Sequence, residues 1–90
     1  MDVREVHDLV RQGKAVRAHN YHAGKRGLGF LEILAALERC YHVEKDNRPD
    51  LPNGWYAFSN LPNKRRLRID FNALVDEVGN LLLVVTAYDA

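Results

Sequence analysis

Apolar residues recur at two different spacings along the chain, and the first of these is helical. Near the start, the residues that repeat every three or four positions are Val3, Val6, Leu9 and Val10. Asp2 and Glu5 have the spacing of a capping box at the start of such a helix, and Gly13 can end it. The pattern predicts a first helix over about residues 3–12.

A second stripe at helical spacing starts near Leu28. Its members are Leu31, Leu34, Leu37 and Tyr41, with Phe30, Ile33 and Cys40 beside them. Such a stripe predicts a helix of about three turns that packs on a sheet. The polar segment 14–26 lies between the two helices. We predict that it is a connector, with Asn20 placed to cap one short helical turn.

After Cys40 the pattern becomes extended. The segments predicted to be strands are 41–45, 55–59, 66–72 and 81–88. The third of them alternates apolar and polar residues, as a half-buried strand does. The last is an almost continuous apolar run, which is typical of a central strand. Proline, glycine and asparagine gather between these segments and predict turns.

This order of elements predicts an α+β fold in which two helical segments pack on an antiparallel sheet of about four strands. We expect one domain over residues 1–90, since the length suits a single core. The predicted core consists of Leu31, Leu34, Leu37, Ile69, Phe71, Leu83 and Val85. Segment 41–45 is the expected sheet edge, where a partner protein or a second copy of the chain would pair.

Composition favours a folded domain outside the membrane. Apolar residues make up 47% and charged residues 28% of the chain, which is ordinary for a globular protein. The longest apolar run, 81–87, is too short to cross a bilayer, and the charged N-terminus does not resemble an export signal. We therefore expect a cytosolic protein. The lone Cys40 lies on the apolar side of the second helix and is expected to behave as a small hydrophobic residue.

Charge is distributed unevenly, although the formal net charge is only +1. Residues 9–31 include the basic residues Arg11, Lys14, Arg17, Lys25 and Arg26 and no acidic residue. A second basic cluster consists of Lys64, Arg65, Arg66 and Arg68. Clusters of this kind can attract a polyanion such as RNA. For either cluster alone, a solvated face that binds nothing is the more common explanation.

The chain lacks the usual sequence motifs for a metal or a cofactor. The candidate metal ligands are His19, His22, Cys40 and His42, but their spacing matches no known zinc motif. Glycines at 24, 27 and 29 do not form a phosphate-binding loop. We therefore expect neither a metal nor a cofactor.

The residue types needed for metal-free RNA cleavage are nevertheless present. Cleavage at a 2′-hydroxyl needs a base that titrates near neutrality, cations for the charge that develops on phosphorus, and an acid for the leaving oxygen. The residues of these types are His22, Lys25, Arg26, Arg66, Arg68 and Tyr88. Structural roles for His22 and Tyr88, as a helix cap or a packed aromatic ring, remain open at this point.

Three motifs in order resemble a known bacterial family. They are the stretch His-Ala-Gly-Lys-Arg-Gly-Leu at 22–28, the sequence Ile-Leu-Ala-Ala-Leu at 33–37, and Val-Val-Thr-Ala-Tyr at 84–88. Together they resemble the domain of unknown function 4258, whose layout is similar to that of the RelE/ParE toxins. The resemblance spans nearly the whole chain. Gly27-Leu28 replaces the usual Gly-Ile step, and the segment 49–54 is longer than usual.

The resemblance implies a RelE-like fold and a toxin-like ribonuclease of a toxin-antitoxin system. In that case His22 and Arg26 at the entry to the second helix and Tyr88 on the last strand are the expected catalytic residues. Lys25, Arg66 and Arg68 are the expected substrate-binding residues. The expected partners are RNA and an antitoxin protein or a second copy of the chain. The alternative is a non-catalytic module that binds protein or nucleic acid.

Overall fold

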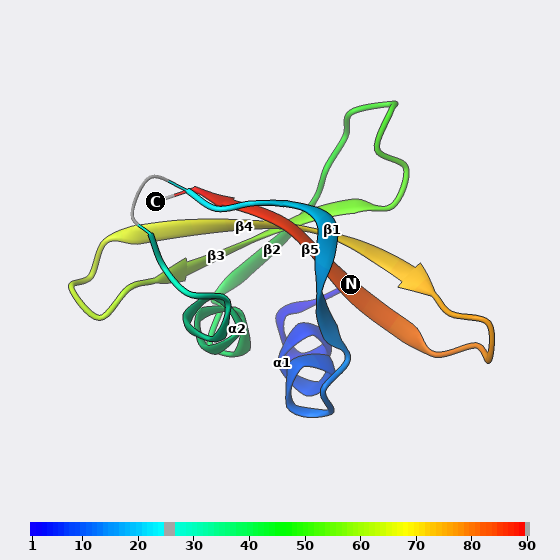
Figure 1. Cartoon of the computed structure of the whole chain (residues 1–90), viewed down its shortest axis with the longest axis horizontal. Coiled ribbons are helices and arrows are strands. Elements are labelled where there is room, and N and C mark those ends of the chain that lie inside the picture. The colour runs from blue at the N-terminus through cyan, green and yellow to red at the C-terminus, as the bar shows by residue number, and fades with distance from the viewer. Residues whose placement is uncertain (25–26, 90) are drawn as a thin grey trace.

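The computed structural model describes residues 1–24 and 27–89 and shows an α+β fold with two helices and a five-stranded sheet (Figure 1). The helices are α1 (Val3–Arg11) and α2 (Phe30–Glu38). The strands are β1 (Ala15–His22), β2 (His42–Lys45), β3 (Gly54–Asn60), β4 (Arg66–Val75) and β5 (Leu81–Asp89). None of the helices in these residues is long and apolar enough to span a membrane.

The sheet is mixed, with strand order β1-β5-β4-β3-β2. Strand β1 runs parallel to β5, while the other neighbouring pairs are antiparallel. Both helices lie against one face of the sheet, and no described helix covers the other face (Figure 1). We call this second face the helix-free face. It displays every second residue of each strand, because side chains alternate along a strand.

Both helices begin as the sequence dictates. Asp2 accepts a hydrogen bond from the Glu5 backbone N–H at 2.9 Å, and Glu5 accepts one from the Asp2 N–H, so the predicted capping box is confirmed. At α2 the side chain of Glu32 accepts a hydrogen bond from the Gly29 N–H at 3.1 Å. These contacts satisfy backbone donors that the first helical turn leaves unpaired.

The expected connector over residues 14–26 is wrong for most of its length. Residues 15–22 form strand β1, so the sheet has five strands and is mixed instead of four-stranded and antiparallel. The strand escaped prediction because its register shifts between Arg17 and His22, and its buried residues Ala15 and Ala18 are three positions apart. That spacing hides the two-residue alternation by which a strand is recognised.

The core lies between the helices and the sheet. Five of the predicted core residues are confirmed as buried, namely Leu37, Ile69, Phe71, Leu83 and Val85. Leu34 is only partly buried. Leu31 was predicted to be buried and is 81% exposed, because the face of α2 that meets the sheet centres on Ile33, Ala36 and Leu37. The stripe that begins at Leu28 therefore faces outward for part of its length.

Candidate functional site

The helix-free face brings together polar and aromatic side chains from all five strands. The register aligns one row across the sheet, consisting of Glu44, Tyr56, Asp70, Ala87 and His22. The next row consists of His42, Phe58, Arg68 and Asp89. Neighbouring strands lie about 4.8 Å apart, so residues on adjacent strands of a row are within contact of each other.

Glu44 organises one end of this face. The Tyr56 hydroxyl donates a hydrogen bond to one of its carboxylate oxygens, and His42 Nε2 lies 2.9 Å from the other. The hydrogen bond from Tyr56, followed by that from His42, lowers the pKa of Glu44, and the same contact raises the pKa of Tyr56. An ionised carboxylate only accepts hydrogen bonds, so the His42 proton sits on Nε2. Nδ1 of the neutral ring is then the proton acceptor.

Arginine side chains lie over the aromatic rings beside this histidine. The guanidinium carbon of Arg66 is 4.1 Å from the centre of the Phe58 ring, and the His42 ring stacks on the same phenyl group. Arg68 lies 5.7 Å from the Tyr56 ring centre, and its Nε is 3.2 Å from Asp70 Oδ1. Cation–π contact holds a guanidinium against a ring without consuming its hydrogen-bond donors. Arg66 can therefore still donate to an anion.

A hollow of about 170 Å³ opens beside this cluster, under the segment that joins β2 to β3. Asn20, Asn72 and Arg48 are among the polar residues that line it, and Asp70 forms part of its floor. The volume is smaller than the roughly 300 Å³ at which drug-sized pockets begin. The hollow can therefore hold only a small group or one part of a larger ligand.

His22 and Tyr88 do not bracket a common cleft. His22 is exposed at the end of β1, where its register partner is Ala87 on the helix-free face. Tyr88, the next residue along β5, points to the helix side and is 4% exposed. Its hydroxyl accepts a hydrogen bond from the Leu28 N–H at 2.9 Å and donates to the Gly24 carbonyl at 3.3 Å. The arrangement gives Tyr88 a structural contact with the entry to α2.

Arg66 and Arg68 lie on the helix-free face, on the same side of β4, as the alternation of that strand predicts. They share this face with His22 but are separated from the Tyr88 side chain by the sheet itself. Lys25 and Arg26, the two remaining expected site residues, lie outside the described residues. The structure therefore joins three of the six expected residues on one surface.

Sequence reasoning missed the cluster around Glu44. The sequence names His42 only as a candidate metal ligand, and it predicts strands at Glu44 and Tyr56 without a chemical role for either residue. A signal was present, because His42 and Glu44 are two apart in a strand-like segment, as are Tyr56 and Phe58. What the sequence does not contain is the register that sets these two pairs opposite each other.

Neither the lone cysteine nor the groups of potential metal ligands indicate a further reactive site. Cys40 is buried, and burial raises the pKa of its thiol to about 11, so it stays protonated at neutral pH. Among residues 1–24 and 27–89, no three histidine, cysteine, aspartate or glutamate side chains are grouped so that they could hold a metal ion.

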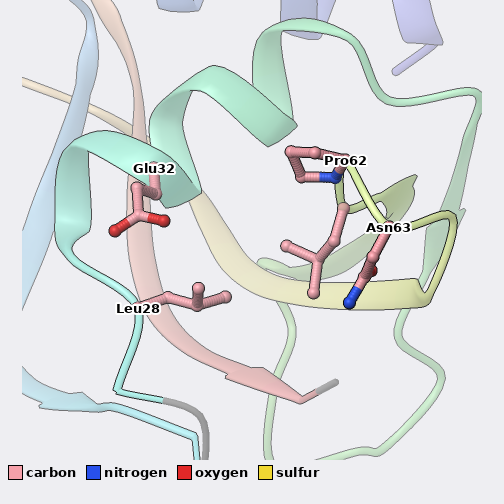
Figure 2. Close-up of a pocket in the computed structure, with 5 residues that line it drawn as sticks. Leu28, Glu32, Pro62 and Asn63 are labelled. Atoms are coloured by element: carbon pink, nitrogen blue, oxygen red, sulfur yellow. The ribbon is translucent and has the colours of Figure 1, made fainter.

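A shallow hollow of about 260 Å³ lies on the helix side, between the start of α2 and the turn after β3 (Figure 2). Leu28, Leu61 and Pro62 give it an apolar lining, and Glu32 is its one carboxylate. That carboxylate already accepts the hydrogen bond from Gly29. Among the described residues that line the hollow, none is placed to act on a substrate.

Comparison with known proteins adds no relative from which a function could be inferred. No family model matches the chain, and neither a curated protein nor a solved structure matches it significantly.

Proposed function

We propose that this protein binds single-stranded RNA on the helix-free face and cleaves it without a metal ion, as a toxin-like ribonuclease would. The observation that carries the proposal is the cluster in which Glu44 orients His42 beside Arg66 and Arg68. A positioned base next to cations is the arrangement that phosphoryl transfer at a 2′-hydroxyl needs. The resemblance of the motifs at 22–28 and 84–88 to a toxin-like family points in the same direction.

In this mechanism His42 Nδ1 removes the proton of a ribose 2′-hydroxyl. The oxygen attacks the adjacent phosphorus and displaces the 5′-oxygen of the next nucleotide, which leaves a 2′,3′-cyclic phosphate. Arg66 and Arg68 donate to the phosphate oxygens as negative charge builds up there. The departing 5′-oxygen takes a proton from solvent, which reaches this exposed surface. Glu44 keeps the proton of His42 on Nε2 and steadies the imidazolium that forms.

The same face offers binding contacts along an RNA chain. Tyr56 offers an aromatic ring to a base, whereas Phe58 is already covered by Arg66 and His42, and the hollow beside Asp70 takes one base. His22 lies at the opposite end of the row from Glu44 and contacts the RNA beyond the scissile group. An RNA substrate is consistent with a cytosolic location.

Cleavage of a fluorescently labelled RNA in the presence of a chelator tests this function. His42→Ala should lower the rate by roughly 10² to 10⁴-fold, because a general base is lost. His22→Ala should reduce the rate less, through weaker binding. His19→Ala is the matched control, since His19 is also an exposed histidine on β1, and it should leave the rate unchanged.

Wild-type protein that does not cut any RNA would refute the ribonuclease. In that case RNA affinity, measured by fluorescence anisotropy, decides whether the alternative binding module holds. Binding that weakens steeply with salt and in Arg66→Gln would support that module. Without either activity, the helix-free face has no role toward RNA.

A protein partner is proposed for the sheet edge. Strand β2 is at the edge of the sheet, as expected, and is only four residues long. An edge strand presents unpaired backbone groups that another strand can bind. We propose that an antitoxin, or a second copy of the chain, adds a strand here. Since Glu44 and His42 belong to β2, such a partner would lie directly beside the catalytic cluster and block it.

A further inference from the structure

Helix α2 presents an outward face that has no partner among the described residues. Leu31 is 81% exposed, and Ala35 one turn later is also exposed. Two hollows, one of about 260 Å³ (Figure 2) and one of about 140 Å³, lie beside the helix, and Leu61 and Pro62 line both. An exposed leucine beside an apolar groove is a common feature of a binding surface.

Opposite charges lie at the two ends of this surface. Glu32 and Arg39 are both exposed, border the second hollow and are seven residues apart. At 1.5 Å per residue this places them about 10 Å apart, on the same side of the helix. Ala35 lies between them and leaves room for another backbone to approach closely. Each charge keeps hydrogen-bonding capacity after its internal contact, Glu32 with Gly29 and Arg39 with the Asn60 carbonyl.

We propose that a second copy of this chain docks here, with the two α2 helices packed antiparallel about a two-fold axis near Ala35. A two-fold axis sets each surface against itself, so the surface must be self-complementary. In an antiparallel pair the same flank of each helix meets its counterpart. Glu32 of one copy therefore lies opposite Arg39 of the other, twice over. Leu31 of each copy lies on the other side of Ala35 from the charged pair, and the neighbouring helix covers it there.

The charge pattern distinguishes this occupant from an unrelated partner. An acidic or a basic peptide would gain from one of the two charged residues and lose at the other, whereas an inverted copy pairs both. A nine-residue helix and one turn bury less area than the roughly 800 Å² that each partner buries in stable complexes. The dimer is therefore weak and forms at high protein concentration.

Sedimentation equilibrium on charge-reversed variants tests the proposal. Glu32→Arg alone and Arg39→Glu alone each set like charges opposite each other, and each should weaken dimerisation by tenfold or more. Mixing these two variants restores attraction at both contacts, so a one-to-one heterodimer should form with at least the wild-type affinity. Any loss of folding in a single variant is then separated from the loss of pairing, because the mixture contains the same two chains.

Glu5→Arg is the matched control, since Glu5 caps the exposed first turn of α1 as Glu32 caps α2. It should leave the dimer unchanged. Three results would overturn the proposal: a wild-type chain that stays monomeric at millimolar concentration, single variants that dimerise as the wild type does, or a mixture that fails to pair. None of these depends on RNA cleavage.

Discussion

The hydroxyl group of Tyr88 ties the last strand to the segment that leads into α2. It bonds both the Leu28 N–H and the Gly24 carbonyl, and the Tyr88 ring packs against Tyr21. Gly24 is required by this contact. A Cβ at that position would lie 2.7 Å from the Tyr88 ring and 2.9 Å from the Tyr88 carbonyl oxygen. Gly24 and Leu28 are thus joined to the last strand through Tyr88.

Tyr88→Phe is expected to destabilise the fold without changing RNA binding or RNA cleavage. Removing the hydroxyl leaves the Leu28 N–H and the Gly24 carbonyl without this partner, at a cost of about 1–3 kcal/mol in the free energy of unfolding. Urea denaturation measures that loss. RNA binding and cleavage by the folded variant should match the wild type, because the hydroxyl lies on the helix side of the sheet. A folded Tyr88→Phe variant with cleavage reduced a hundredfold would instead make Tyr88 catalytic.

At the scale of elements, charged side chains fix the conformation of the segment between β2 and β3. Asp46 is buried, and Arg48 binds its carboxylate through Nε and through a second guanidinium nitrogen at 2.7 Å. Lys45 Nζ donates to the carbonyls of Asp46 and Gly54, closing the loop from inside. The loop forms one wall of the hollow beside Asp70, so these contacts shape the proposed RNA site.

Acid should loosen this loop. Hydrogen bonds from Arg48 lower the pKa of Asp46 from 3.8 to about 2. A lowered pKa in the folded state contributes stability that is present above pH 3.8 and is lost as pH falls through about 2. We expect Asp46→Asn to be less stable than the wild type at pH 6 and to approach it at pH 2. Chemical denaturation at the two pH values measures the difference. An equal gap at both would show that the ion pair does not stabilise the loop.

Elements with a regular period were predictable from the sequence, and those without one were not. The capped helix α1 and the alternating strand β4 follow directly from residue spacing. Strand β1 did not, because a shift in its register breaks the alternation. Leu31 shares the helical spacing of Leu34 and of the buried Leu37, and only the orientation of α2 on the sheet decides that it faces out. The Glu44 cluster depends on strand register, which short-range spacing does not determine.

At the scale of the whole molecule, the two faces of the sheet differ, because the helices cover only one of them. The helices cover one face (Figure 1) and build the core with it. By strand register, the other face displays the arginines, aromatic rings and His42. The sheet is open, so it has two edge strands, β1 and β2. A core on one side and a solvated surface on the other is common in sheets whose strands are mostly antiparallel. Each edge carries residues of the candidate site, with His22 on β1 and the hydrogen-bonded pair of His42 and Glu44 on β2.

Blocking the outer side of β2 should abolish edge pairing and spare the fold. The Asp46 N–H donates to the Gly54 carbonyl, so by alternation Glu44 also faces β3 while the Val43 N–H points away from the sheet. Val43→Pro removes that outward donor, and proline is tolerated on an edge strand. We expect the folded variant to lose any partner strand that binds wild-type β2, as measured by co-purification from the host and by sedimentation. Glu44→Pro is the contrasting variant, because it removes a bond within the sheet and should unfold this edge. Retention of the partner by Val43→Pro, or a wild type that binds none, would place the partner surface elsewhere.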